Sequence, residues 1–197
     1  YKNRIINISD KKIVKKIKIN PKILNIKKQN LLQNCLVLKN TLGKKNFQNF
    51  HGVSIDSRTL KKNNLFLALK GKKYDGSKFI SHALKKGAGC VVSSSNNKIN
   101  DKKIIKIKDT ISFLNKFARN KREITSAKII AITGSAGKTS LKNLIKNLLQ
   151  NFGESHSSPR SFNNHYGVPL SLSNLNINHK FGVFEVGMSK SGEINSL

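Results

Sequence analysis

A lysine and a threonine follow a short glycine-containing stretch in the middle of the chain, and these residue types at this spacing can bind a nucleotide phosphate. The stretch 133–139 reads Thr-Gly-Ser-Ala-Gly-Lys-Thr. Glycines let backbone amides approach an anion, the Lys138 ammonium can reach the β- and γ-phosphates, and the Thr139 hydroxyl can bind magnesium. The general motif begins with a glycine where this chain has Ile132, so the loop is a shortened variant that begins at Gly134.

The residues on either side of this loop predict a strand before it and a helix after it. Residues 129–132 form the short apolar run that is typical of a buried parallel strand. After the loop, apolar residues recur with the period of one helix face, and Gly153 is expected to end the helix. These apolar residues are Leu141, Leu144, Ile145, Leu148, Leu149 and Phe152. The order strand, loop, helix argues against a chance match to the motif and favours ATP as the ligand.

A carboxylate at the end of a later strand is suited to hold the metal ion of such a site. Residues 181–186 read as a strand that ends around Glu185. Doubly wound sheets place an acid at this point, beside the phosphate loop. We therefore expect Lys138 and Glu185 to be catalytic, and Thr139 and Glu185 to bind Mg²⁺. The residues expected to bind ATP are Gly134, Ser135, Ala136, Gly137, Lys138, Thr139 and Ser140.

Residues 21–126 alternate between strand and helix patterns, which predicts an α/β domain with a largely parallel sheet. Strands are expected at 53–55, 65–69, 90–92 and 104–107. Helices are expected before Gly43, between a Ser77 cap and Gly87, and after a cap at Asp109 or Thr110. Residues 121–127 are expected to form a polar joint, and residues 155–161 a serine-rich loop. The aromatic residues expected in the core are Phe47, Phe50, Phe66 and Phe79.

The composition is strongly basic but does not by itself indicate a nucleic-acid-binding protein. The formal net charge is +29, yet only five of the 38 basic residues are Arg, the side chain best suited to phosphate and base contacts. The basic residues are also spread along the chain. A phosphate-loop NTPase that binds nucleic acid remains an alternative. The two cysteines and five histidines show no metal-ligand spacing, and no apolar run is long enough to span a membrane, so a cytoplasmic protein is expected.

Seven segments, taken in order, resemble the Mur ligases, which are ATP-dependent enzymes that form amide bonds in peptidoglycan synthesis. The segments are Val53–Arg58, Asn64–Gly71, Tyr74–Gly76, Gly87–Ala88, Ile132–Ser140, Phe162–Leu170 and Phe184–Gly187 with Gly192–Ile194. Within the family, the Asn-Asn-x-x-Gly-Val-Pro and Gly-Glu-Ile stretches favour the member that adds D-Ala-D-Ala to UDP-N-acetylmuramoyl-tripeptide. The resemblance implies that both of these compounds are substrates.

The resemblance also implies domains and further site residues. Residues 21–126 would bind the UDP-muramoyl peptide, and residues 127–197 would begin the doubly wound ATP-binding domain. Asn163, Asn164 and His165 would shape the region of the carboxylate and the γ-phosphate, with ordinary Asx turns as the alternative. In the first domain, Ser57 and Arg58 would contact the UDP end. Arg58 could instead form a structural ion pair with Asp56 or Asp75.

Residues 1–20 do not fit either domain. Residues 1–19 resemble the tail of the sister ligase that adds the third amino acid, which suggests a fusion, and a basic extension is the alternative. The chain is expected to be a fragment of a longer, monomeric enzyme, and alone it could be an inactive nucleotide-binding piece.

Overall fold

The computed structural model describes residues 26–43, 49–71, 75–94, 98–160 and 162–187. The interpretations that concern residues 1–20, Phe47, Tyr74 and residues 192–194 lie outside these ranges. Within them, the prediction of an α/β chain with parallel sheets is confirmed, since every paired strand runs parallel to its neighbours.

The first sheet has four parallel strands in the order β1-β2-β3-β4. The strands are β1 (Val53–Ser54), β2 (Leu65–Leu67), β3 (Cys90–Ser94) and β4 (Ile104–Ile107). Side chains alternate between the two faces, so Leu65 and Leu67 belong to one buried cluster and Phe66 to another. The thiol of Cys90 is buried among these residues, as expected, and its burial raises the pKa to about 12.

Three helices cover the first sheet, and their ends follow ordinary capping chemistry. They are α2 (Ile26–Leu42), α3 (Ile80–Lys85), which follows the 3-10 helix η2 (Gly76–Phe79), and α4 (Thr110–Ile124). Gly43 ends α2 with a φ of 69°. The Asp109 carboxylate caps α4 by accepting from the Ile111 and Ser112 amides. The expected Ser77 cap is wrong, because Asp75 accepts from the Ser77 amide instead.

One expectation about which side chains are buried is wrong, and two buried polar side chains were not expected. In α2 the buried residues include the polar Gln33 and Asn34. Phe79 is 54% exposed, because it lies at the end of η2 rather than in the core. By contrast, Phe50 and Phe66 are fully buried, as expected.

The second sheet has three parallel strands in the order β5-β7-β6. The strands are β5 (Lys128–Ile132), β6 (Ser155–Ser157) and β7 (Phe181–Glu185), and the helices between them are α5 (Lys138–Gln150) and α6 (Gly167–Ser173). Strand β6 corrects the expected serine-rich loop, because its backbone pairs with β7. Ile132 is the register partner of Glu185, so β5 and β7 end side by side.

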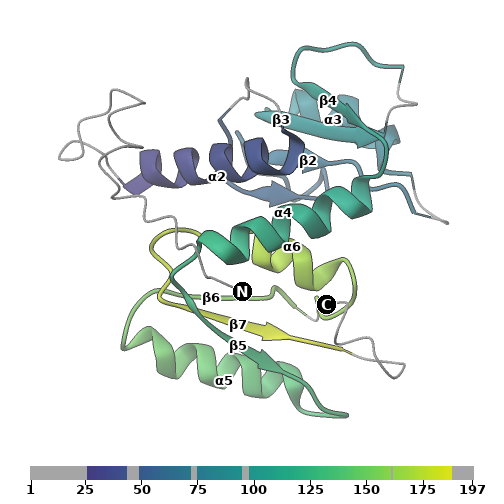
Figure 1. The fold of residues 1–197 in the computed structure, drawn as a ribbon. Helices are drawn as coiled ribbons and strands as arrows, with labels where there is room; N and C mark the ends of the chain where they lie inside the picture. The colour runs from purple at the N-terminus through teal and green to yellow at the C-terminus, as the bar shows by residue number, and fades with distance from the viewer. Residues whose placement is uncertain (1–25, 44–48, 72–74, 95–97, 161, 188–197) are drawn as a thin grey trace.

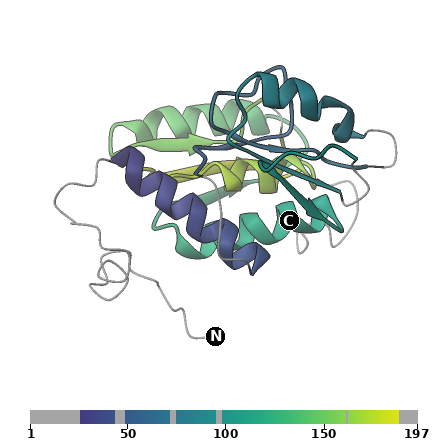
Figure 2. The same cartoon turned by 90° about the horizontal axis from the view of Figure 1, so that it is seen from above.

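The two sheets lie in layers, with α4 and α6 packed between them (Figure 1). Helix α3 lies on the outer face of the first sheet and α5 on the outer face of the second (Figures 1 and 2). Helix α6 contributes Leu170 to the core of the first layer and Leu172 to that of the second. The expected polar joint at 121–127 is wrong in its first half, because α4 continues to Ile124 and Lys121 is buried.

Candidate active site

The loop between β5 and α5 has the backbone that a phosphate-binding loop needs. Gly134 and Gly137 have φ angles of 150° and 74°, which other residues rarely adopt. Gly137 is also the N-cap of α5 and brings no side chain to cap its first amides, which leaves them to face a ligand. Lys138 Nζ lies against the loop and donates to the carbonyl oxygens of Gly134, at 2.6 Å, and Ser135, at 3.2 Å.

Glu185 lies at the end of β7, directly beside the start of α5. Its Oε2 accepts from the Thr139 hydroxyl at 2.8 Å, and its Oε1 accepts from Asn163 Nδ2 at 2.9 Å. The side chain is buried. Burial alone would raise its pKa, but the hydrogen bonds from Thr139 and Asn163 and the charge of Lys142 outweigh burial and hold the pKa below its ordinary value. The carboxylate is therefore anionic at neutral pH.

The sequence interpretation missed Lys142, a buried lysine that partners this carboxylate. Lys142 Nζ lies 3.6 Å from Glu185 Oε2, with the two side chains 1% and 2% exposed. It also donates to the Arg160 carbonyl oxygen. Its spacing from Lys138 and Thr139, four and three residues along one helix, places it on the same face and could have revealed it.

The three expected residues after β6 have different surroundings. Asn163 binds Glu185, and its carbonyl oxygen accepts from the Gly187 amide at 2.7 Å. Asn164 Oδ1 accepts from the Tyr166 and Gly167 amides at 3.1 and 2.9 Å, which is the Asx turn considered above. His165 is exposed, and the centroid of its ring lies 3.9 Å from the centroid of the Tyr166 ring. Ser135, Ala136 and Ser140 are all exposed at the loop and the first turn of α5.

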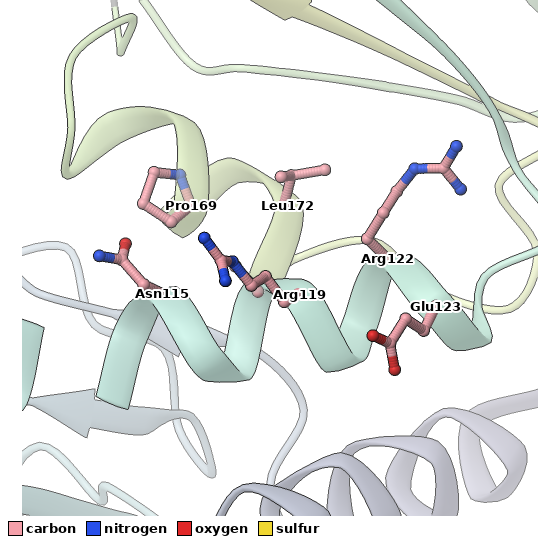
Figure 3. Close-up of a pocket in the computed structure, with 7 residues that line it drawn as sticks. Asn115, Arg119, Arg122, Glu123, Pro169 and Leu172 are labelled. Carbon is pink, nitrogen blue, oxygen red and sulfur yellow. The ribbon is translucent and has the colours of Figure 1, made fainter. Parts of the chain in front are cut away.

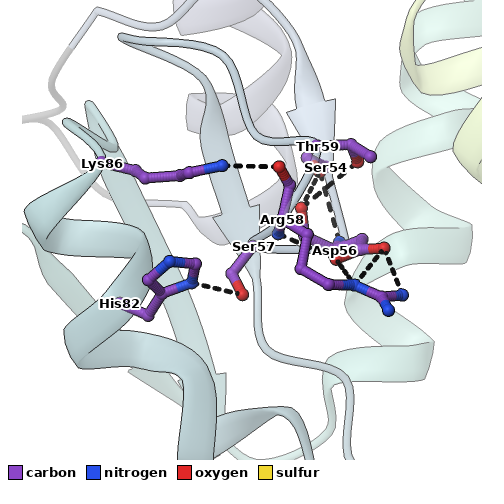
Figure 4. Close-up of polar contacts among 7 residues, drawn as sticks. All are labelled: Ser54, Asp56, Ser57, Arg58, Thr59, His82 and Lys86. Atoms are coloured by element: carbon purple, nitrogen blue, oxygen red, sulfur yellow. Dashed lines mark hydrogen bonds and ion pairs between the residues drawn. The ribbon is translucent and has the colours of Figure 1, made fainter.

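Ser57 and Arg58 follow β1, and their hydrogen bonds go to Asp56, His82 and Lys86 (Figure 4). The Arg58 guanidinium binds the Asp56 carboxylate, with Nη2 2.8 Å from Oδ2, and this side chain is 84% exposed. The ion pair with Asp56 considered above is therefore present, and it leaves the rest of the guanidinium open to solvent. The buried Ser57 hydroxyl lies 3.0 Å from His82 Nδ1, and Lys86 Nζ donates to the Arg58 carbonyl oxygen at 2.5 Å.

A groove of about 250 Å³ lies between α4 and α6 (Figure 3). Its lining residues are Asn115, Ala118, Arg119, Arg122, Glu123, Pro169 and Leu172. None of them belongs to the phosphate loop or is hydrogen-bonded to Glu185, so the groove is separate from the chemistry described above.

The histidines show no metal centre. No group of three or more His, Cys, Asp or Glu side chains in the described part of the chain could hold a metal ion. His156 and His179 stack at 5.0 Å between ring centroids, and burial lowers the pKa of both to about 4. None of the helices in the described ranges is both long and apolar enough to cross a membrane.

Comparisons with known proteins agree with these features. Residues 49–146 match the model for the Mur ligase family, catalytic domain, and residues 132–197 match the Mur ligase middle domain. The UDP-N-acetylmuramoyl-tripeptide--D-alanyl-D-alanine ligases of Rickettsia prowazekii and Bacillus subtilis are 42% and 33% identical, over 77% and 82% of this chain. The matches cover 34% and 36% of those proteins, so the chain spans about a third of their length.

Two solved structures have the same fold. A crystal structure of MurF from Acinetobacter baumannii aligns with a TM-score of 0.68 at 26% identity, covering 82% of this chain and 37% of that one. The MurF ligase of Thermotoga maritima, solved in complex with ADP, aligns with a TM-score of 0.60 at 32% identity, covering 74% and 34% of the two chains. The ordered motifs, the parallel layers and these matches together show that the chain belongs to the Mur ligase family.

Proposed function

We propose that this chain is part of an ATP-dependent ligase that joins D-Ala-D-Ala to UDP-N-acetylmuramoyl-tripeptide. The observation that carries the proposal is the Thr139–Glu185 pair at the adjacent ends of β5 and β7, next to a glycine loop with a lysine. The names and sequence identities of the relatives support the choice of substrates. The position of the pair supports ATP as the energy source, as does the ADP-bound relative.

The loop residues are proposed to bind the phosphates of ATP. Backbone amides of residues 134–137 and of the first turn of α5 would donate to the phosphate oxygens, and Lys138 would stabilise charge on the β- and γ-phosphates. Ser140, exposed on the first turn, would lie next to these phosphates without binding the metal.

Thr139 and Glu185 fit a magnesium ion. Mg²⁺ prefers oxygen donors and usually takes one or two protein ligands together with phosphate oxygens and water. A hydroxyl and an anionic carboxylate, 2.8 Å apart, supply this kind of donor set. When bound, the ion would neutralise charge on the phosphate oxygens. Asn163 would then hold the other carboxylate oxygen in place, and Asn164 would fix Asn163 through the turn into α6.

The reaction would proceed in two steps. A carboxylate oxygen of the tripeptide substrate attacks the γ-phosphorus of ATP, and the bond from that phosphorus to the β–γ bridging oxygen breaks. The products of this step are an acyl phosphate and ADP. The amine of D-Ala-D-Ala then attacks the acyl carbon, loses a proton and displaces phosphate. Lys138 would balance the charge in the first step, and the exposed His165 would lie near the attacking carboxylate. Ser57 and Arg58 would bind the UDP end, since the guanidinium is largely open to solvent.

The full-length protein tests this proposal directly. Continued ADP release over many turnovers is expected to require ATP, UDP-N-acetylmuramoyl-tripeptide and D-Ala-D-Ala together. Without D-Ala-D-Ala the reaction should stop at the acyl phosphate after at most one turnover. Release that is instead stimulated by DNA or RNA, with a strong salt dependence, would favour the alternative NTPase.

The variant Lys138→Ala tests the assignment of the phosphate loop. It is expected to lose nearly all ATP affinity, by roughly 10- to 100-fold or more, because charge-assisted hydrogen bonds to phosphate are lost. Lys146→Ala, two turns along the same helix, is the matched control and should bind ATP normally. Calorimetry with ATP measures both, and an unchanged affinity in Lys138→Ala would overturn the assignment.

A further inference from the structure

The side chain of Asn174 completes the free edge of the first sheet. Strand β1 is the edge strand, and the Gly52 carbonyl oxygen accepts from the Leu65 amide of β2. Backbone groups alternate in direction along a strand, so the N–H and C=O of Val53 point away from β2. Asn174 Oδ1 accepts from the Val53 amide at 2.9 Å, and its Nδ2 donates to the Val53 carbonyl oxygen at 3.0 Å.

This amide has a single orientation. Its Nδ2 also donates to the Leu170 carbonyl oxygen at 2.9 Å, so both amide protons and the oxygen are engaged. The contact joins residues 121 positions apart and fixes the C-terminal end of α6 to β1. The Asn174 side-chain amide therefore pairs with the outward N–H and C=O of Val53, as the backbone of a neighbouring strand would.

Gly52 leaves the space that this contact needs. A Cβ built on Gly52 would lie 2.8 Å from Asn174 Oδ1, closer than real Cβ contacts allow. The φ of Gly52 lies outside the positive range, so glycine is needed here for space rather than for conformation. The glycine at position 52 is thus a second observation, separate from the hydrogen bonds, that links the sequence of β1 to the Asn174 side chain.

The other end of α6 is attached to the candidate active site. Asn164 forms an Asx turn just before the helix, where its Oδ1 accepts from the Tyr166 and Gly167 amides, and the adjacent Asn163 binds Glu185. Helix α6 has seven residues, so it spans about 10 Å at 1.5 Å per residue. At its far end, Asn174 holds β1, and β1 leads into the loop with Ser57 and Arg58.

We infer that Asn174 is a positioning residue, which sets the placement of the loop after β1 relative to Glu185 through α6. The inference rests on the proposed function, in which the first loop holds the UDP end of a substrate and Glu185 lies where its carboxylate is phosphorylated. The substrate held at the loop after β1 must bring its carboxylate to the γ-phosphate of ATP beside Glu185. The rate of such a reaction depends steeply on the relative placement of the two reacting groups. The hydrogen bonds of the Asn174 side chain go to backbone groups of Val53 and Leu170, and neither residue is proposed to bind ATP or substrate.

The variant Asn174→Ala of the full-length protein separates placement from binding. The kcat/KM for UDP-N-acetylmuramoyl-tripeptide is expected to fall about 10- to 100-fold, because misplacement slows the chemical step. The Kd values of ATP and of UDP, each of which contacts only one layer, should stay within about twofold of wild type. An unchanged kcat/KM would overturn the inference, and so would a parallel loss of both affinities, which would indicate general misfolding.

A second variant reaches the same contact without changing Asn174. Gly52→Ala should displace the amide and lower kcat/KM in the same way, and the double variant Gly52→Ala/Asn174→Ala should be no worse than Asn174→Ala. Additive losses would show that Gly52 does not act through Asn174 and would contradict the inference. Asn178→Ala, at a half-buried position whose side chain makes no hydrogen bond in the described part of the chain, is the matched control.

A distance measurement keeps the test independent of turnover. Spin labels at the exposed positions Lys106→Cys and Asn143→Cys, in a Cys35→Ser background, report the separation of the two layers. Asn174→Ala should broaden the distance distribution, and an unchanged distribution would overturn the inference. If the wild-type protein binds ATP but does not turn over the substrates, the proposed function fails, and this measurement still decides the role of Asn174.

Discussion

The sheet of β1–β4 and the sheet of β5–β7 bury different kinds of side chain beneath their helices. In the first layer, α2 and α4 cover one face and α3 the other, and both interfaces consist mainly of apolar side chains. In the second layer, α5 turns three of its leucines outward. Leu141, Leu144 and Leu148 are 46%, 56% and 57% exposed, while the Lys142 side chain on the same helix is 1% exposed.

The contrast between the two layers shows that the spacing of apolar residues predicts where a helix lies in the sequence. It does not determine which edge of the helix faces the sheet. In α4 the apolar residues Leu114 and Phe117 face the first sheet, as their spacing predicts. In α5 the edge facing β7 carries Thr139 and Lys142, which bind the Glu185 carboxylate. The inward edge of α5 therefore carries the polar site, and three leucines of the apolar stripe lie outside that edge.

Removing the buried cation should have the largest effect on stability. Lys142→Met leaves the Glu185 carboxylate buried without its cation, which is expected to lower the free energy of unfolding by about 3–5 kcal/mol. Urea denaturation monitored by circular dichroism measures this loss. Lys146→Met, one turn further along α5, is the matched control and should change it by about 0.5 kcal/mol at most. A loss below about 1 kcal/mol in Lys142→Met would mean that the pair is not a structural centre of this layer.

Leucine truncation compares the apolar contributions of the two layers. Leu114→Ala removes a fully buried side chain from the first core and should cost about 2–5 kcal/mol. Leu148→Ala removes a side chain that is 57% exposed and should change stability by about 0.5 kcal/mol or less. The same denaturation measurement serves both variants. Equal losses would show that the outer face of α5 is covered in the intact protein and would remove the contrast between the layers.

The sequence predicts most elements of the first layer because its signals are local. Apolar runs such as 90–92 and 104–107 are strands, Gly43 ends a helix, and Asp109 begins one. The proximity of Thr139 and Glu185 could also be predicted, because parallel strands end at the same edge of a sheet. Their roles toward ATP and magnesium remain predictions.

The sequence could not reveal features that depend on distant partners. Strand β6 reads Ser-His-Ser, with no apolar pattern, and exists because its backbone pairs with β7. Gln33 and Asn34 look like surface residues of α2, yet they are buried, and their side-chain oxygens accept from Lys121 of α4. Asn174 pairs with Val53, and no local pattern indicates that contact.

Lys121 offers the finest comparison, because it is a buried lysine that binds neutral groups instead of a carboxylate. Its Nζ donates to Gln33 Oε1 at 2.7 Å and to Asn34 Oδ1 at 2.6 Å, and the residue is 1% exposed. Burial disfavours the cation and lowers the pKa from 10.5 to about 7. Between these two values the unfolded chain binds a proton that the folded chain lacks, so the free energy of unfolding rises with pH.

The variant Lys121→Met should remove this pH dependence. We compare the free energy of unfolding of the wild type with that of the variant. From pH 7 to about 8.5, the wild-type value is expected to rise relative to the variant value by at most about 1.4 kcal/mol per pH unit, which is the limit for one proton. Below pH 7 the difference should level off, because both states of the wild-type chain are then protonated at Lys121. Urea denaturation across this range measures the two profiles, with the exposed Lys116→Met on the same helix as the control. Parallel profiles for wild type and Lys121→Met would mean that Lys121 stays charged when folded, so that two amide oxygens stabilise a buried cation as well as the Glu185 carboxylate does.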